Sequence, residues 1–290
     1  MALTLDIRIK KDLDDLVFSH EISEASALNK AGVLKEPLST KGLPMYFTGD
    51  RQAKTVLVML NPRTSAIEAD WNYRNEVHRL FIDDQHGVNS FYNTYIDAMT
   101  NFGRIDRHRY DQFDLKLAFF LYEWKDSGIS FPAGFPNDKS TYLEAKEAIL
   151  LQKLQLELIP YASETFSLKN PDKLIPVYVE SLFDEIFSTE EGQNRYIIFC
   201  SNVFERLFKN YNSNSKNNSN VYDVKITSKE AVPSSTAKIG YCTKVIITRK
   251  ADQKTIKVMI ANTFANRLWV RSPQRMKAYG SACYQKYQTY

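Results

Sequence analysis

Apolar residues in this chain fall into short runs, each ended by a polar or proline-containing turn. The clearest run, Val-Leu-Val-Met-Leu at 56–60, stops at Asn61-Pro62-Arg63. An apolar run without alternation predicts a strand that is buried on both faces, as in a parallel sheet covered by helices. Further strands are predicted at 154–159, 195–200, 238–248 and 255–262.

Between these runs, apolar residues recur at helical spacing. The predicted helices lie at 11–35, within 66–126, at 115–124, 142–151, 176–187 and 201–209, and from 272 into the C-terminal tail. Ser140 or Thr141 is the expected N-cap of the helix that begins at 142. Pro and Gly predict a loop at 130–136, and the Asn/Ser-rich stretch 210–220 predicts a mobile surface loop.

Strands that alternate with helices predict an α/β fold with a central, mostly parallel sheet. The last two strands lie too close in sequence for a crossover helix, so we expect one antiparallel pair at the end of the sheet. A chain of 290 residues can form one large domain. We expect a single domain over 1–290 with an N-terminal helical extension at about 1–43.

Composition narrows the class of protein. A net charge of +4 is compatible with a nucleic-acid partner and equally with an ordinary solvated surface. Three widely separated cysteines without a CxxC pair argue against a disulfide framework or a zinc site. The N-terminus lacks an apolar signal core, and no apolar run approaches the roughly 20 residues of a membrane helix. We therefore expect a cytoplasmic protein with no membrane span and no cofactor, and we favour a monomer.

Three strand-to-loop junctions, at 60–65, 157–163 and 260–265, carry the candidate chemistry. In a doubly wound sheet such junctions open toward the edge at which ligands bind. Asn61 is the leading candidate, because a carboxamide both donates and accepts and can hold a water or a polar ligand in one orientation. The alternative is an Asn that serves only the turn before Pro62.

Glu157 is the anomalous residue of the second junction. The leucines at 154, 156 and 158 share one face of the predicted strand, and Glu157 points the other way. A carboxylate in a covered strand is costly unless it is paired or hydrogen-bonded. Glu157 therefore either lines a site at the strand end or forms a salt bridge with a structural Arg or Lys.

Other residues near the junctions are candidates for phosphate or base contacts. An Arg fork suits phosphate, and aromatic rings stack bases, although rings at such spacings also fill cores. The candidate phosphate ligands are Arg63, Ser65, Ser163 and Arg267, and the candidate base-binding rings are Tyr161 and Phe91. The sequence contains no P-loop, GxGxxG or GxSxG motif, which removes the main support for kinase, dinucleotide and common hydrolase functions.

The segment PMYFTG at 44–49, followed by VLVMLNPRTS at 56–65, resembles the first motif of the uracil-DNA glycosylase superfamily, above all its mismatch-specific branch with Asn-Pro in that motif. LELIPYAS is similar to the second strand and turn of that superfamily, RYIIFCSNVFERLF to the third strand and helix, and TIKVMIANTFANRL falls at the last motif. The resemblance implies a three-layer α/β/α fold and a cleft that accepts a base flipped out of DNA.

The resemblance also implies roles for individual residues. Asn61 would position the attacking water. Glu157 stands where the family often has an Asn that reads uracil; an ionised Glu only accepts and better suits an amino group such as that of cytosine. Asn262 lies where the family usually carries a His-Pro-Ser sequence, and no histidine occurs after His108. Asn262 is thus the candidate support for the leaving base.

Two main hypotheses follow. The first is an N-glycosidic hydrolase acting on a flipped-out base in DNA, and the second is a module of the same fold that binds nucleic acid or a nucleotide without cleavage. A third is an enzyme acting on an unrelated nucleoside or sugar. For the hydrolase we expect Asn61 and Asn262 to face each other across one cleft, and Glu157 to share the pocket of Asn61.

Overall fold

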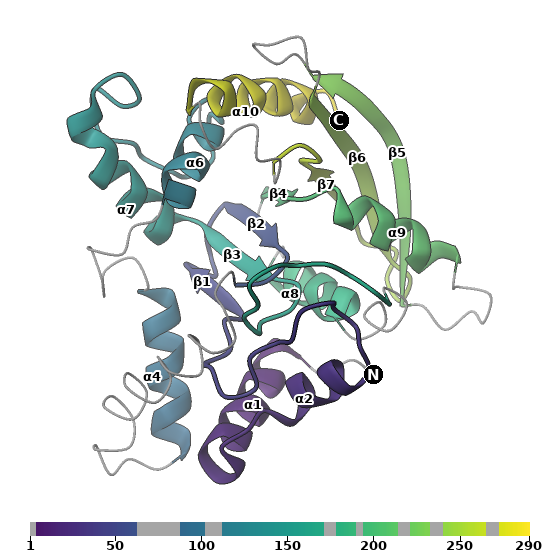
Figure 1. The fold of residues 1–290 in the computed structure, drawn as a ribbon. Helices are drawn as coiled ribbons and strands as arrows, with labels where there is room; N and C mark the ends of the chain where they lie inside the picture. Colours follow the sequence, from purple (N-terminus) through teal and green to yellow (C-terminus); the bar gives the residue numbers. More distant parts are fainter. Residues whose placement is uncertain are drawn as a thin grey trace. The chain divides into compact units, whose positions relative to one another are not determined.

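The computed structural model of the protein describes residues 4–62, 88–101, 112–170, 178–189, 194–213, 221–232, 240–264 and 273–290. The strands of these residues form one seven-stranded sheet in the order β1-β3-β2-β4-β7-β6-β5 (Figure 1). In chain order they are β1 (Phe47–Gly49), β2 (Thr55–Met59), β3 (Leu154–Glu157), β4 (Tyr196–Phe199), β5 (Tyr222–Val232), β6 (Gly240–Arg249) and β7 (Thr255–Ile260).

The middle of the sheet is parallel. β2 pairs with β4 from Thr55 opposite Tyr196 to Val58 opposite Phe199, and β4 pairs with β7 in the same direction. Every residue of β2 is buried, as expected for a parallel strand that is covered on both faces. The predicted α/β fold with a mostly parallel central sheet is confirmed.

The C-terminal side of the sheet is antiparallel and larger than predicted. β6 pairs with β7, which confirms the predicted antiparallel pair, but β6 also pairs with β5, a strand that the sequence analysis missed. Burial alternates along the whole of β5, and a bulge between Ile226 and Ser228 interrupts the pairing. After Ile226 the half-buried positions Ser228 and Glu230 are polar, so the hydrophobic alternation in the sequence stops halfway along the strand.

Helices lie between β2 and β3, between β3 and β4 and between β4 and β5, mostly where they were predicted. The described helices are α1 (Leu5–Ser19), α2 (Ser23–Lys30), α4 (Val88–Thr100), α6 (Gln112–Leu121), α7 (Tyr142–Gln152), α8 (Glu180–Thr189), α9 (Val203–Ser213) and α10 (Pro273–Gln288), with a 3-10 turn η3 (Lys139–Thr141) before α7. None of the helices in the described ranges has both the length and the apolar character to cross a membrane.

The predicted helix at 11–35 is in fact two helices. α1 ends at His20, whose φ of 55° is left-handed. Asp15 then accepts a hydrogen bond from the backbone NH of Ser23 at 2.9 Å, at the start of α2. A contact between residues eight positions apart, which helical periodicity does not encode, therefore holds this break.

Two other local predictions are refined. Thr141 is the N-cap residue of α7, as predicted, but its side chain forms no capping hydrogen bond; Asp138 accepts from the backbone NH of Ser140 at 2.9 Å and caps η3. α9 continues to Ser213, so the first residues of the predicted loop at 210–220 are helical. Residues 214–220 lie outside the described ranges.

The chain divides into two compact units. The first consists of Met1–Phe47, Leu60–Met99 and Leu156–Ser188, and the second of Thr48–Met59, Thr100–Gln155 and Thr189–Tyr290. The N-terminal helices α1 and α2 therefore share a unit with residues far along the chain. The expected single domain over 1–290 stays a prediction.

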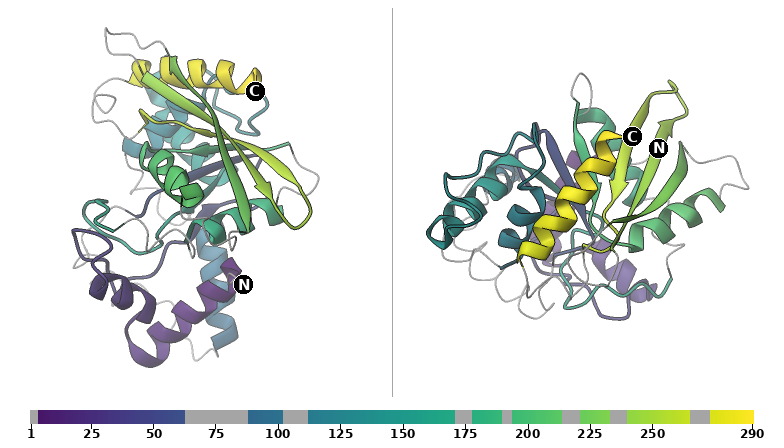
Figure 2. Two further views of the ribbon diagram at one scale, coloured as in Figure 1. Left: turned by 90° about the vertical axis from the view of Figure 1, so that its right-hand side faces the viewer. Right: turned by 90° about the horizontal axis from the view of Figure 1, so that it is seen from above.

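Helices cover both faces of the sheet in the second unit. On one face, Leu57 and Ile198 belong to an apolar cluster with residues of α6 and α10. On the other face, the ring of Phe199 lies 4.9 and 5.1 Å, between centroids, from the rings of Phe204 and Phe208 on α9. α9 and α10 thus lie on opposite sides of these strands (Figure 2), which confirms the three-layer α/β/α arrangement.

The bulge in β5 changes which of its residues face each helix. Before the bulge, Val224 faces α9. After it, Lys229 faces α9 and forms an ion pair with Glu205 at 2.9 Å, whereas Glu230 pairs with Lys286 of α10, also at 2.9 Å. One inserted residue therefore reverses which positions of β5 face α9, from even-numbered positions before the bulge to odd-numbered positions after it.

α6 and α10 approach each other closely at Gly280. A Cβ atom added there would lie 1.8 Å from the carbonyl oxygen of Phe120 in α6. Because the neighbouring atom belongs to the backbone, a side-chain rotation cannot make room for it.

We predict that Gly280→Ala lowers the free energy of unfolding by about 2 kcal/mol or more, since α10 must move away from α6. The sign is informative, because Ala in a helix is ordinarily more favourable than Gly by about 1 kcal/mol. Urea unfolding measures the change. Gln285→Ala, at an exposed position of the same helix, should alter stability by less than about 0.5 kcal/mol. An unchanged or more stable Gly280→Ala variant would contradict the close approach.

Candidate functional site

Two hydrogen bonds hold the side chain of Asn61, which follows β2 by two residues. Its Nδ2 donates to Ser163 Oγ at 2.7 Å and to the carbonyl oxygen of Tyr161 at 3.3 Å. Ser163 is fixed in turn, because its backbone NH donates to the carbonyl oxygen of Pro62 at 3.2 Å and its hydroxyl to that of Thr165 at 3.1 Å. The first and second junctions therefore meet within the first unit.

These partners define the orientation of the Asn61 amide. A carbonyl oxygen only accepts, so the atom that faces Tyr161 must be Nδ2 rather than Oδ1. No donor among the described residues bonds to Oδ1. A half-buried carboxamide oxygen with a fixed direction can accept a hydrogen bond from a water or from a ligand. The same bonds also stabilise the turn, so both interpretations of Asn61 remain.

The two predicted base-binding rings are buried. Tyr161 is 1% exposed and Phe91 is 6% exposed. The hydroxyl of Tyr161 donates to Asp12 Oδ2 at 2.8 Å, which ties the ring into the core of the first unit. Stacking against a base would require these rings to be uncovered, so their role in base binding stays a prediction without an exposed ring face to support it.

Asp12 is a buried carboxylate that the sequence analysis missed. It accepts hydrogen bonds from the hydroxyls of Tyr46 at 2.7 Å and Tyr161 at 2.8 Å. Burial raises the pKa of Asp12 to about 6, although these two bonds act in the opposite direction. One turn earlier on α1, Arg8 is also buried and pairs with Glu24 at 3.1 Å. In the sequence, two charged residues four positions apart on the apolar face of one helix could have identified this buried polar cluster.

Glu157 ends β3 and is 5% exposed. Its backbone NH donates to the carbonyl oxygen of Tyr46 at 3.2 Å, within the first unit. The described contacts of its carboxylate do not decide between a pocket shared with Asn61 and a structural salt bridge. Both alternatives remain predictions.

At the third junction, in the second unit, Asn262 joins a network around Glu205. Its Nδ2 donates to Glu205 Oε2 at 2.8 Å, and its Oδ1 accepts from Thr243 Oγ1 at 2.8 Å. Lys209 and Lys229 bind the same carboxylate at 2.7 and 2.9 Å. Burial alone would raise the pKa of Glu205, but the two lysines hold that pKa below its ordinary value, so the carboxylate is ionised.

This network fixes the amide of Asn262 and limits what it can do. One hydrogen of Nδ2 is used by Glu205, which leaves the second for a ligand. The predicted role of Asn262 as a donor to a leaving base requires that hydrogen. Asn61 and Asn262 belong to different units, and their predicted common cleft stays a prediction.

Sequence reasoning overlooked Glu205, because an acidic residue in the first turn of a helix is ordinary there. Its importance comes from partners on three other parts of the fold: Lys229 on β5, Thr243 on β6 and Asn262 after β7. These partners lie 24 to 57 positions away in the chain. No local pattern in the sequence connects them.

Three of the four predicted phosphate ligands, Arg63, Ser65 and Arg267, lie outside the described residues. Ser163 is described and 1% exposed, and its hydroxyl is used between Asn61 and Thr165. In this conformation Ser163 orients Asn61 instead of presenting a hydroxyl at the surface.

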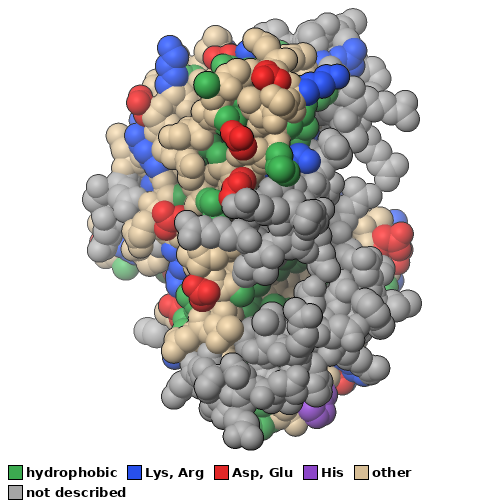
Figure 3. Space-filling model, turned by 90° about the vertical axis from the view of Figure 1, so that its left-hand side faces the viewer, with side chains coloured by type: hydrophobic (Ala, Val, Ile, Leu, Met, Phe, Trp, Pro, Cys, Tyr) green, Lys and Arg blue, Asp and Glu red, His purple; other side chains and the backbone are tan. Residues whose placement is uncertain are grey.

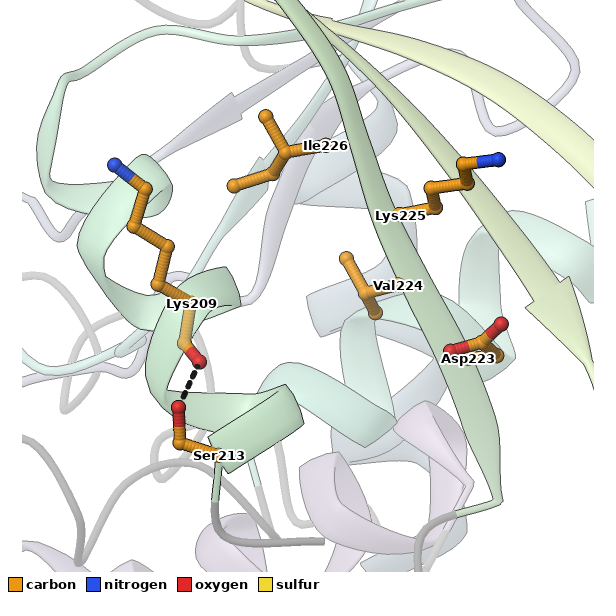
Figure 4. Close-up of a pocket in the computed structure, with 6 residues that line it drawn as sticks. All are labelled: Lys209, Ser213, Asp223, Val224, Lys225 and Ile226. Carbon is orange, nitrogen blue, oxygen red and sulfur yellow. Dashed lines mark hydrogen bonds between the residues drawn. The ribbon is translucent and has the colours of Figure 1, made fainter.

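Two surfaces illustrate how the charged side chains are distributed. An open hollow of about 490 Å³ lies between α9 and β5; Ile226 points toward it, whereas Lys225 points away (Figure 4). On the face in Figure 3, basic and acidic side chains of the described residues are interspersed. Neither surface gathers basic residues in the way that a groove for a phosphate backbone does.

The described ranges also contain no group of three His, Cys, Asp or Glu side chains that could hold a metal ion.

We predict that Asp12→Asn flattens the dependence of stability on pH between about pH 4 and 7. Folding raises the pKa of Asp12 from an ordinary 3.8 to about 6. The folded state therefore binds more protons than the unfolded state in this range, and the contribution of Asp12 to the free energy of unfolding falls as pH rises. A shift of about two pKa units corresponds to roughly 3 kcal/mol.

Urea unfolding of the wild type and Asp12→Asn at pH 4.5 and 7.5 measures this difference. Asn keeps an acceptor for the two tyrosine hydroxyls but carries no charge. The exposed Glu36→Gln serves as a control that should keep the slope of the wild type. Parallel pH profiles for the wild type and Asp12→Asn would show that burial does not raise the pKa of this carboxyl.

Comparisons with known proteins give no family assignment. No protein-family model matches the chain, no curated protein matches it, and no solved structure matches it. These comparisons neither support nor refute the resemblance to uracil-DNA glycosylases. The inferences about function therefore rest on the residues and contacts of this chain.

Proposed function

We propose that this protein is a glycosylase-like hydrolase that cleaves the N-glycosidic bond between deoxyribose and a base flipped out of DNA. The observation that carries the proposal is the fixed amide of Asn61. Nδ2 donates to Ser163 and to the Tyr161 carbonyl, and these bonds leave Oδ1 as an acceptor of defined direction. Such an acceptor can hold a water with one lone pair aimed at the anomeric carbon.

The position of Asn61 in the chain also supports a ligand site. Asn61 follows the carboxyl end of β2, and β2 lies between β3 and β4 in the sheet. The chain runs from β2 to one neighbour and returns to β4 on the other side, so the strand order reverses at β2. In open α/β sheets, ligands bind outside the carboxyl ends of the strands at such a point.

The proposed reaction requires only a water as the second reactant. The oxygen of the water forms a bond to the anomeric carbon while the bond from that carbon to the base nitrogen breaks. The base leaves with the electron pair of the broken bond, the water releases a proton to solvent, and the base takes up a proton from solvent. An ionised Glu157, in the same unit as Asn61, would favour a base that presents an amino group.

A binding module on the same fold is the alternative, and one observation favours it. Both ends of the Asn262 amide are engaged with Glu205 and Thr243, an arrangement that suits a structural role. A module of this kind would bind nucleic acid or a nucleotide and leave the glycosidic bond intact.

We predict that Asn61→Ala lowers the single-turnover rate of base release by about 100-fold or more, because the positioned acceptor is lost. Ser163→Ala should lower it by roughly 5-fold, since it removes one of the two bonds that orient the amide. Oligonucleotides that carry different mismatched and modified bases provide the assay, with abasic sites revealed by alkaline cleavage.

Asn29→Ala is a matched control for loss of folding. Asn29 also forms two hydrogen bonds, both with the backbone of Leu38 in the first unit, so its removal should reduce stability but leave the rate unchanged. Binding of DNA without abasic sites across the panel would favour the module. Absence of both binding and cleavage would reject a DNA substrate.

A further inference from the structure

Lys116 is a lysine within the apolar helix α6, and it contacts the turn that follows β7. Its Nζ donates to the carbonyl oxygen of Phe264 at 2.5 Å. The same nitrogen lies 4.5 Å from the ring centroid of Phe264 and 5.9 Å from that of Phe113. All three residues belong to the second unit, and Lys116 is only half-buried. The amine is therefore packed against aromatic rings, while the residue as a whole keeps part of its surface exposed.

Within the described ranges, no carboxylate lies close enough to form an ion pair with Lys116. Other lysines of this unit do have such partners, for example Lys209 with Glu205 and Lys286 with Glu230. Without a nearby anion, burial lowers the pKa of Lys116 to about 8. At neutral pH about one amine in ten then carries a free lone pair, which makes a lysine nucleophilic toward carbonyl compounds.

The turn that Lys116 contacts is rigid and contains Asn262. The backbone NH of Thr263 donates to the hydroxyl of Tyr279 at 3.1 Å, and the hydroxyl of Thr263 accepts from the backbone NH of Tyr241 at 2.8 Å. The amine of Lys116 thus approaches this turn from α6, whereas the amide of Asn262 in the same turn bonds to Glu205 on α9.

We propose that Lys116 forms an imine with an aldehyde ligand at this turn, and that the aldehyde is the ring-opened deoxyribose of an abasic site in DNA. This inference rests on the proposed function, because release of a base by hydrolysis produces that sugar. The observations that carry it are the half-buried amine, which has no carboxylate partner among the described residues, its packing against the rings of Phe113 and Phe264, and the carbonyl of Phe264 that orients it.

The step balances without an oxidant or a reductant. The unprotonated Nζ attacks the aldehyde carbon, and the carbonyl oxygen takes up a proton to give a carbinolamine. The bond from carbon to that hydroxyl then breaks, water leaves, and the nitrogen supplies the electron pair of the new carbon–nitrogen double bond. The Phe264 carbonyl accepts a hydrogen bond from Nζ and holds the lone pair in one direction.

We expect the full chain to be trapped on an oligonucleotide that already contains an abasic site when sodium cyanoborohydride is present. The hydride reduces the imine to a stable amine, and the adduct migrates as a protein–DNA band on a denaturing gel. Mass spectrometry of the digested wild-type adduct should place the modification on Lys116. Trapping should increase several-fold from pH 7 to pH 9 as the amine loses its proton.

Lys116→Arg is the matched variant, because a guanidinium still donates to the Phe264 carbonyl but stays protonated. We expect it to reduce trapping by at least 10-fold, whereas Lys225→Arg, on an exposed part of β5, should leave trapping unchanged.

Absence of an adduct, an adduct on another lysine, or full trapping by Lys116→Arg would overturn the inference. The abasic site is made beforehand, so a failure of base release does not affect this result, and a failure of trapping does not bear on base release.

Discussion

The central strand β2 is buried along its whole length and pairs in parallel with β4, and this constraint organises the rest of the molecule. A parallel strand has no solvated face, so helices must cover the sheet on both sides. α6 and α10 cover one face of the second unit and α9 covers the other. Parallel pairing also brings the carboxyl ends of these strands to one edge, where the polar turns begin.

The polar side chains at these turns satisfy one another before any ligand binds. Asn61 bonds to Ser163 and to a backbone carbonyl, and Asn262 bonds to Glu205 and Thr243. A buried polar group requires such partners for stability, and the same bonds fix the direction of each amide. Among the described residues, one oxygen on Asn61 keeps its capacity to accept a hydrogen bond, and the proposed chemistry depends on this atom.

Buried ionisable groups have different consequences in the two units. Asp12 in the first unit is surrounded by tyrosine hydroxyls and lies near the Arg8–Glu24 pair, so its titration affects stability. Lys116 in the second unit contacts a carbonyl and two aromatic rings. Burial disfavours the charged form of both groups; it raises the pKa of Asp12 to about 6 and lowers that of Lys116 to about 8.

Local patterns in the sequence determined the α/β class, the parallel strands, the antiparallel β6–β7 pair and the place of Asn61 at a strand end. Hydrophobic periodicity encodes these features, because each depends on neighbouring residues. Tertiary structure alone decided the break between α1 and α2, the bulged strand β5 and the pairing of Asn262 with Glu205 across 57 positions. Packing chooses such hydrogen-bond partners from anywhere in the chain, so no local pattern records them.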